Sequence, residues 1–234
     1  MKKTIKFLFI FTLLLSLSAC SSKTDKEYAL TFFDAFNETL NMNSGHMTGS
    51  FISNANRDSK IRFDLGMNQE NNLELSCDVD LEAGANTNDN FINFYIKDGK
   101  TYLNASGVKS QSVVENIGLK KDQKLSIFNP FLDYTDKELQ NFFRSASKKN
   151  NTYTFTLDPS SIAAYLDALG SIQIEEAILK TTIEEDVLKD FSLKINGYQT
   201  IQSEQVTIDI QIQCYFDQIN TFNTINFPAD LETY

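Results

Sequence analysis

The sequence predicts an α+β fold with a large antiparallel sheet whose apolar face is covered by short helices. Segments of strand length alternate apolar and polar residues, which is typical of strands with one buried and one wet face. They follow one another without a β-α-β rhythm, which indicates antiparallel pairing. Short amphipathic stretches separate two blocks of strands, and as helices they can pack on the apolar face of the sheet.

The N-terminal part of this domain is predicted to be one helix followed by strands. Apolar residues recur at helical spacing over residues 28–42, and Asn43-Ser44-Gly45 is expected to end the helix. Period-two alternation then predicts strands at 61–67 and 73–82. The Asn-rich segment 84–90 is expected to be a loop.

A tight hairpin is predicted around Asp98-Gly99, because a type I′ turn needs a positive φ at both central positions. It would join strands at 91–97 and 100–104. Residues 107–113 are expected to continue as a further short strand.

The middle of the chain is predicted to be mostly helical. Thr135 and Glu138 have capping-box spacing and are expected to open a helix that runs as far as residue 149, with cations in its last turns. A strand is predicted at 152–157, and Asp158 then begins another helix. The last third returns to alternating strands, predicted at residues 172–181, 188–198 and 205–219.

The N-terminus predicts export and a lipid anchor. Three lysines precede an apolar run over residues 7–17, as in a secretory signal. Leu17-Ser18-Ala19-Cys20 resembles the bacterial lipobox, in which the cysteine receives a diacylglycerol and the chain is cut before it. We expect residues 1–19 to be the signal peptide, 20–27 the lipidated cysteine and a polar tether, and 28–234 a single domain. The alternative is an ordinary signal peptide with an incidental cysteine.

The expected location is therefore the extracytoplasmic face of the cell membrane, reached through the two acyl chains on Cys20. An extracytoplasmic setting permits disulfides, and Cys77 and Cys214 both lie on apolar strand faces. They can be buried thiols or a bridge, and the sequence leaves both open.

Composition excludes several classes of function. The 234 residues carry 21 Lys and Arg against 31 Asp and Glu, a net charge of -10, which disfavours a nucleic-acid partner. His46 is the only histidine and is expected in a polar turn without a nucleophile nearby. Acidic residues on one strand lack a calcium-loop pattern and are interpreted as a solvated face. We expect no catalytic residue, no metal and no cofactor, and hence no enzyme.

A family resemblance rests on three parts of the sequence. They are the hairpin Tyr-Ile-Lys-Asp-Gly-Lys-Thr-Tyr-Leu-Asn at 95–104, the Gly-x-Lys strand after it, and the Asn-Phe-Pro at 226–228. With the order of elements, these resemble the LolA/LppX-like lipoprotein superfamily, most of all its Gram-positive branch. The resemblance implies an open half-barrel, a curved sheet with helices in its concave face. Its better-known members carry acyl chains of lipids or lipoproteins between sheet and helices, and Cys20 matches their usual anchor.

An acyl-chain site needs only a concave apolar lining that core side chains leave unfilled. The expected ligand is a lipid or acyl chain, bound by strand residues that face inward and helix residues opposite them. This lining comprises Phe63, Leu65, Leu75, Cys77, Phe94, Ile208, Ile210 and Ile212 from the strands, and Phe142, Tyr165 and Leu166 from the helices.

Two alternatives stay open at this point. The same residues can pack as a solid core, in an envelope interaction or sensor lipoprotein that binds a protein partner. A hydrolase of cell-envelope material is the more distant alternative.

Overall fold

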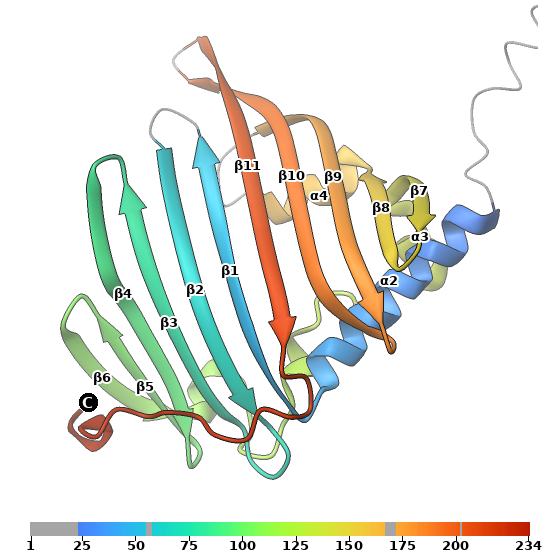
Figure 1. Cartoon of the computed structure of the whole chain (residues 1–234). Helices are drawn as coiled ribbons and strands as arrows, with labels where there is room; N and C mark the ends of the chain where they lie inside the picture. The colour runs from blue at the N-terminus through green and yellow to red at the C-terminus, as the bar shows by residue number, and fades with distance from the viewer. Residues whose placement is uncertain (1–22, 55–57, 167–171, 202) are drawn as a thin grey trace, which may run out of the picture.

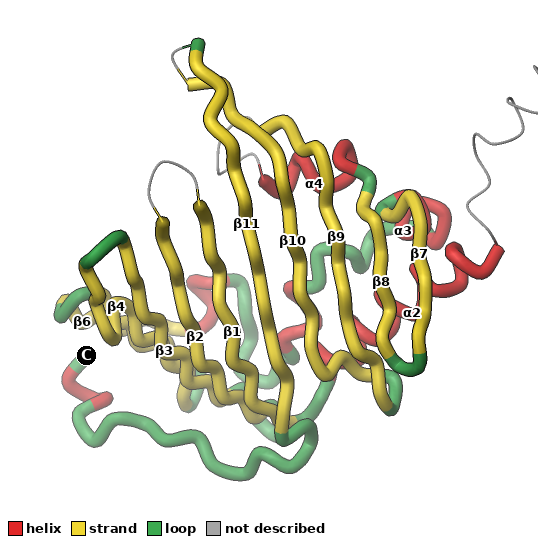
Figure 2. The backbone as a smooth tube through the Cα atoms, turned by 45° about the horizontal axis from the view of Figure 1, so that its top comes forward, coloured by secondary structure: helices red, strands yellow, loops and turns green. Residues whose placement is uncertain are grey.

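The computed structural model describes residues 23–54, 58–166, 172–201 and 203–234. Within these residues, eleven strands form one antiparallel sheet in the order β6-β5-β4-β3-β2-β1-β11-β10-β9-β8-β7 (Figure 1). Short helices lie against its concave side, as Figure 2 shows. The predicted α+β half-barrel is therefore confirmed.

The sheet has two halves that meet where strands from opposite ends of the sequence pair. These are β1 (Ser44–Asn54) and β11 (Glu204–Asp217), with His46 opposite Asp217. One half continues with β2 (Asp58–Asn68), β3 (Glu74–Ala83), β4 (Asn86–Lys97), β5 (Lys100–Ala105) and β6 (Val108–Val113). The other continues with β10 (Val187–Ile201), β9 (Ile172–Glu184), β8 (Thr152–Leu157) and β7 (Phe143–Lys149).

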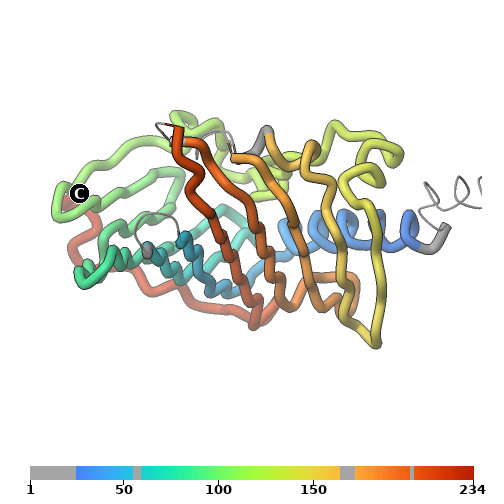
Figure 3. The backbone as a smooth tube through the Cα atoms, turned by 90° about the horizontal axis from the view of Figure 1, so that it is seen from above, coloured from blue at the N-terminus to red at the C-terminus, as the bar shows by residue number. Residues whose placement is uncertain are grey.

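The helical cover is small compared with the sheet. Its longest element, α2 (Lys23–Asn41), lies behind the β7–β10 side, and Figure 3 shows it from above. The other helices are single or double turns: η1 (Val114–Ile117), η2 (Leu125–Phe128), α3 (Asp136–Asn141), α4 (Pro159–Leu166) and, at the C-terminus, η4 (Leu231–Thr233).

Two separate cores lie on the covered face. The larger joins α2 and α3 to β7–β11 and includes Phe32, Phe155 and Ile195. The smaller joins β3 and β4 to the segment after β6 and includes Leu75 and Leu119. The cover therefore seals the two flanks of the sheet as independent units.

The convex face is crossed by the C-terminal segment, residues 218–234, which runs past β1–β5 toward β6 (Figure 1). Phe222 lies on Gly66, where a Cβ would come within 2.8 Å of the ring. Leu231 packs with Tyr95 and Tyr102 in a third, small core. An ion pair between Lys109 and Asp230 fixes the end of the segment to β6.

Much of the predicted secondary structure is confirmed. The hairpin at Asp98-Gly99 has positive φ at both residues, 52° and 78°, as type I′ requires. Thr135 and Glu138 form the predicted capping box, and Asp158 accepts a hydrogen bond from the Ser160 amide at the start of α4. The helix predicted from residue 28 begins earlier, at Lys23.

Three expectations are wrong. The polar turn assigned to His46 is the central strand β1, whose two glycines weaken the alternation signal. The Asn-rich loop at 84–90 is largely the first part of β4, since the hairpin turn there is short. The helix expected to reach residue 149 ends at Asn141, and the cations after it lie on the edge strand β7.

The alternative of a disulfide is settled by sheet order. Cys77 on β3 and Cys214 on β11 are free thiols, with β2 and β1 between their strands. At about 4.8 Å per strand spacing, three spacings exceed the reach of an S–S bond. Burial raises the pKa of Cys77 to about 11 and that of Cys214 to about 12, so both thiols stay protonated at neutral pH.

Gly49 on β1 gives the first testable prediction. A Cβ there would lie 2.3 Å from the Phe63 ring and 2.4 Å from the carbonyl oxygen of Gln213. Since a neighbouring backbone atom cannot move cheaply, Gly49→Ala is expected to lower the free energy of unfolding by about 1–3 kcal/mol. Urea unfolding measures this, with Ser50→Ala on the same strand as the control. Equal stability of the two variants would contradict the close approach of Phe63 to β1.

Candidate functional site

The first cavity of the concave face lies under the aromatic side of α2. Phe33 packs edge-on against Phe131, with ring centroids 4.8 Å apart, and Phe143 stacks on Phe155 at 4.4 Å. A cavity of about 210 Å³ remains between these rings and strands β8–β10. Its lining is entirely apolar: Phe32, Phe33, Phe36, Phe131, Phe142, Phe143, Leu157, Ile162, Leu179, Phe191, Leu193 and Ile195.

A second cavity of about 240 Å³ lies where α2 ends and η2 crosses the central strands. Phe128 lines it while remaining 52% exposed, so this cavity is in contact with solvent. The rings of Phe191 and Phe216, one from each cavity, are 6.4 Å apart, so the two cavities are neighbours. Its lining comprises Thr39, Leu40, Met42, Met47, Leu65, Met67, Leu125, Phe128 and Phe216.

Gln69, at the end of β2, fixes the cover over the second cavity. Its side-chain amide donates to the carbonyl oxygens of Leu40 and Met42, at 2.9 and 2.6 Å. Its Oε1 accepts a hydrogen bond from the amide of Leu125 at 2.9 Å. One buried side chain therefore holds both the end of α2 and the start of η2 at the sheet.

Asn129 fixes the cover between the two cavities. Its Nδ2 donates to Asn37 Oδ1 on α2 at 3.1 Å, and its Oδ1 accepts from the amide of Phe131 at 3.0 Å. Phe128 and Phe131 on either side of it line different cavities. The Phe-Asn-Pro-Phe segment at 128–131 thus contributes to both sites from one hydrogen-bonded position.

A strip of apolar side chains on the concave face lies between the two cores and is only half-buried. Register places Phe51 opposite Ile61 and Ile212, and Phe63 opposite Val79, so they share one face. The strip consists of Met47, Phe51, Ile61, Phe63, Val79, Ile92 and Ile212, each half-buried. The sheet therefore presents apolar surface that the helices within the described residues do not fully cover.

The residues expected to line a groove fall into several environments. Phe142 lines the first cavity and Leu65 the second. Phe63 and Ile212 belong to the half-buried strip. The other strand residues lie in or against the cores: Ile208 and Ile210 are buried in the larger, Leu75 is buried in the smaller, and Cys77 and Phe94 pack against it.

Three expected residues cannot be placed in this way. Tyr165 and Leu166 belong to α4, but their side chains lie outside the described residues. Cys20 also lies outside them.

Sequence reasoning missed most of the aromatic lining of the first cavity. The helical spacing over residues 28–42 predicts that Phe32, Phe33 and Phe36 form the buried face of a helix, as they do, but their part in a cavity depends on how the sheet curves beneath them. Gln69 and Asn129 carried no signal in the sequence, because the partners that give them a role are distant in the chain.

His46 lies on the convex face and has no free ring nitrogen. Its Nε2 is 3.0 Å from Asp64 Oδ1 and its Nδ1 is 2.9 Å from Asp217 Oδ1. Its ring stacks on Phe222 at 5.9 Å between centroids. Partial burial would lower the pKa of His46, but the two carboxylates outweigh it and raise that pKa above the usual value. Such a ring cannot act as the base for a hydroxyl nucleophile.

Neither a metal-ion cluster nor a membrane-spanning helix is found in the described part of the chain. No group of three or more His, Cys, Asp or Glu side chains there could hold a metal ion. No helix among the described residues is both long enough and apolar enough to cross a membrane.

Comparison with known proteins finds several solved structures of similar backbone arrangement. No family model matches the sequence, and no curated protein matches it. The chain is similar to LprF from Mycobacterium bovis, at 13% identity over 87% of this chain and 97% of that one, with a TM-score of 0.42. It is also similar to a LolA superfamily protein from Nitrosomonas europaea, at 8% identity over 86% and 94%, with a TM-score of 0.26. At these identities and TM-scores the likeness is one of backbone arrangement and extends to no residue or ligand.

The contacts of His46 with Asp64 and Asp217 predict that the stability of the fold depends on pH. Because the folded pKa is raised, the stabilisation is fully present below the ordinary histidine pKa of about 6.5 and is lost as pH rises through the folded value. We expect the stability difference between the parent and His46→Gln to be largest at mildly acidic pH and to shrink in alkali. Urea unfolding across this range measures it. A difference that stays constant or grows with pH would contradict the assignment.

Proposed function

We propose that this protein is a membrane-anchored extracytoplasmic lipoprotein that binds an apolar ligand, a lipid or acyl chain, between its sheet and its helices. The observation that carries the proposal is the pair of neighbouring apolar cavities beside a half-buried apolar strip. A folded protein in water gains by covering such a surface, and a ligand can cover it where helices do not.

The chemistry of the lining supports hydrocarbon rather than a polar ligand. Each methylene group moved from water into the site contributes about 0.8 kcal/mol without any hydrogen bond. The first cavity is lined by aromatic and aliphatic side chains alone, and Thr39 is the one polar residue of the second. Its hydroxyl is already committed, because it donates to the Ala35 carbonyl and accepts from the Leu188 amide. Any polar headgroup would therefore lie outside the cavities.

A second candidate function is a non-enzymatic envelope protein that binds a protein partner. Exposed apolar residues on the cover favour it, since Leu132 is 56% and Ile127 41% exposed. In that case the cavities would be packing defects of a solid core, and added volume would strain them.

A pair of matched substitutions distinguishes the two functions. Leu193→Phe adds volume to the wall of the first cavity, while Ile210→Phe adds similar volume where the side chain is 1% exposed and no described cavity adjoins it. We expect Leu193→Phe to leave the free energy of unfolding nearly unchanged and to reduce the lipid seen by native mass spectrometry. Ile210→Phe is expected to cost about 1–3 kcal/mol.

The opposite result would favour the protein-binding function. If Leu193→Phe destabilises as much as Ile210→Phe and the parent carries no lipid, the concave face is a filled core. Lipid extraction from the parent, purified in a detergent that keeps the fold, supplies the second measurement.

The anchor is tested separately from the cargo. Cys20→Ala removes the thiol that would form the thioether, so the chain is expected to leave the membrane fraction or to remain as uncut precursor. Fractionation followed by mass measurement of the product checks this. A mature-sized product that stays on the membrane would contradict acylation at Cys20.

A further inference from the structure

The distance between the expected anchor and the folded domain is short. In the sequence, Ser21 and Ser22 alone separate Cys20 from Lys23, where α2 begins. Three residue steps span about 10 Å even when fully extended. If Cys20 sits at the bilayer surface, the first turn of α2 must therefore lie next to the headgroups.

The first turns of α2 lie against one edge of the sheet. The Tyr28 ring packs edge-on against Tyr153 of β8, with centroids 5.4 Å apart. The Lys148 ammonium of β7 lies over the same Tyr153 ring, 4.6 Å from its centroid. Figure 1 shows the start of α2 beside β7. The β7 edge is therefore the part of the sheet nearest to the anchor.

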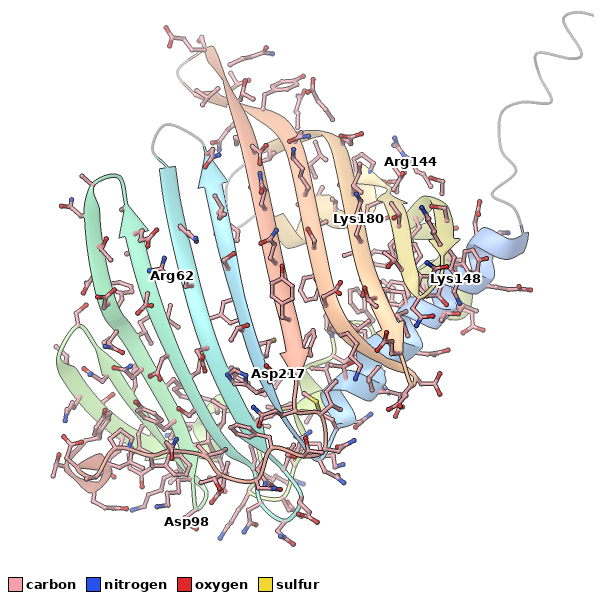
Figure 4. The ribbon with its side chains drawn as sticks, viewed as in Figure 1. Arg62, Asp98, Arg144, Lys148, Lys180 and Asp217 are labelled. Carbon is pink, nitrogen blue, oxygen red and sulfur yellow. The ribbon has the colours of Figure 1, made fainter. Side chains whose placement is uncertain are left out.

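Cations gather at this edge of an otherwise acidic chain. Between Asn141 and Asp158 the sequence has Arg144, Lys148 and Lys149 and no acidic residue. Lys180 adds another from β9, two strands in from β7, and Figure 4 shows Arg144, Lys148 and Lys180 at the same end of the molecule.

Acidic groups limit this charge without reversing it. Arg144 Nε is paired with Asp158 Oδ2 at 3.0 Å, and Glu184 stands at the end of β9. In the first turns of α2, Asp25 and Glu27 balance Lys23 and Lys26, so α2 adds no net charge there. At the opposite edge of the sheet the cations are engaged, because Lys109 pairs with Asp230 and Lys100 with Glu232 of the C-terminal segment. Lys148 and Lys149 are exposed.

We propose that the β7 edge, defined by Arg144, Lys148, Lys149 and Lys180, is the surface that meets the anionic headgroups of the membrane carrying the anchor. This proposal rests on the proposed acylation of Cys20 but not on the binding of a lipid in the cavities. Basic side chains within a Debye length of an anionic leaflet are attracted to it, and the short tether keeps this edge of the sheet on the membrane side of the domain.

Fluorescent labels on the two edge strands test the orientation. The acylated full chain carries a cysteine label at Ser147→Cys on β7 or at Ser110→Cys on β6, both exposed positions. The native thiols do not compete at neutral pH because their pKa values are raised. Each protein is placed in vesicles of phosphatidylcholine, with or without phosphatidylglycerol, that contain a headgroup-bound quencher.

We expect quenching at position 147 to exceed that at 110 by about threefold or more, since the edges lie roughly 50 Å apart along the sheet. Quenching at 147 should increase with phosphatidylglycerol. It should fall in Lys148→Glu/Lys149→Glu, while Lys120→Glu/Lys121→Glu, with the same change in charge on a distant loop, leaves it unchanged.

Three results would overturn the proposal, and they differ in what else they affect. Equal or greater quenching at 110 overturns the orientation. If quenching at 147 changes neither with phosphatidylglycerol nor in Lys148→Glu/Lys149→Glu, headgroup binding is overturned, and the tether alone explains the orientation. A chain that fails to sediment with the vesicles overturns the anchor as well, whereas absence of lipid from the cavities changes neither label and concerns the proposed cargo alone.

Discussion

An eleven-stranded sheet with one apolar face needs more cover than the described residues of this chain supply. α2 and the short helices around it seal the flanks, where Phe155 and Leu119 are almost completely buried. Between the flanks the sheet keeps apolar side chains half in contact with water, at a cost of about 25 cal/mol for each Å² left exposed. The two cores, the two cavities and the position of the Phe-Asn-Pro-Phe segment all follow from this mismatch between sheet and cover.

Alternation of apolar and polar residues was enough to predict the class of fold and most strands, because a face that packs against helices must repeat every second residue. It failed where another requirement dominated. β1 carries Gly45 and Gly49 on its inner face, since the Phe63 ring and the Met42 side chain occupy the space a Cβ would fill. β7 follows a genuine capping box so closely that helix and strand signals overlap, and only pairing with β8 decides between them.

The site was less predictable than the fold for a physical reason. Ile210 on β11 and Leu193 on β10 are similar residues at inward positions of adjacent strands, opposite Ile195 and Ile212 respectively, and period-two alternation treats them alike. Which of them adjoins empty space depends on where α2 and the 128–131 segment lie above the sheet, and those positions are set by Gln69 and Asn129 through partners remote in sequence. The sequence therefore identifies which residues face inward from the sheet, but not which of them adjoin a cavity.

The pairing of β1 with β11 has a consequence for how the molecule forms. His46 and Asp217 are opposite each other although 171 positions separate them in the chain. Each half of the sheet is built from neighbouring hairpins that can assemble locally, but the seam between the halves waits for the last long strand. High contact order of this kind slows folding, and under the proposed export it would delay closure of the sheet until β11 has crossed the membrane. The apolar face would stay open to its surroundings throughout that interval.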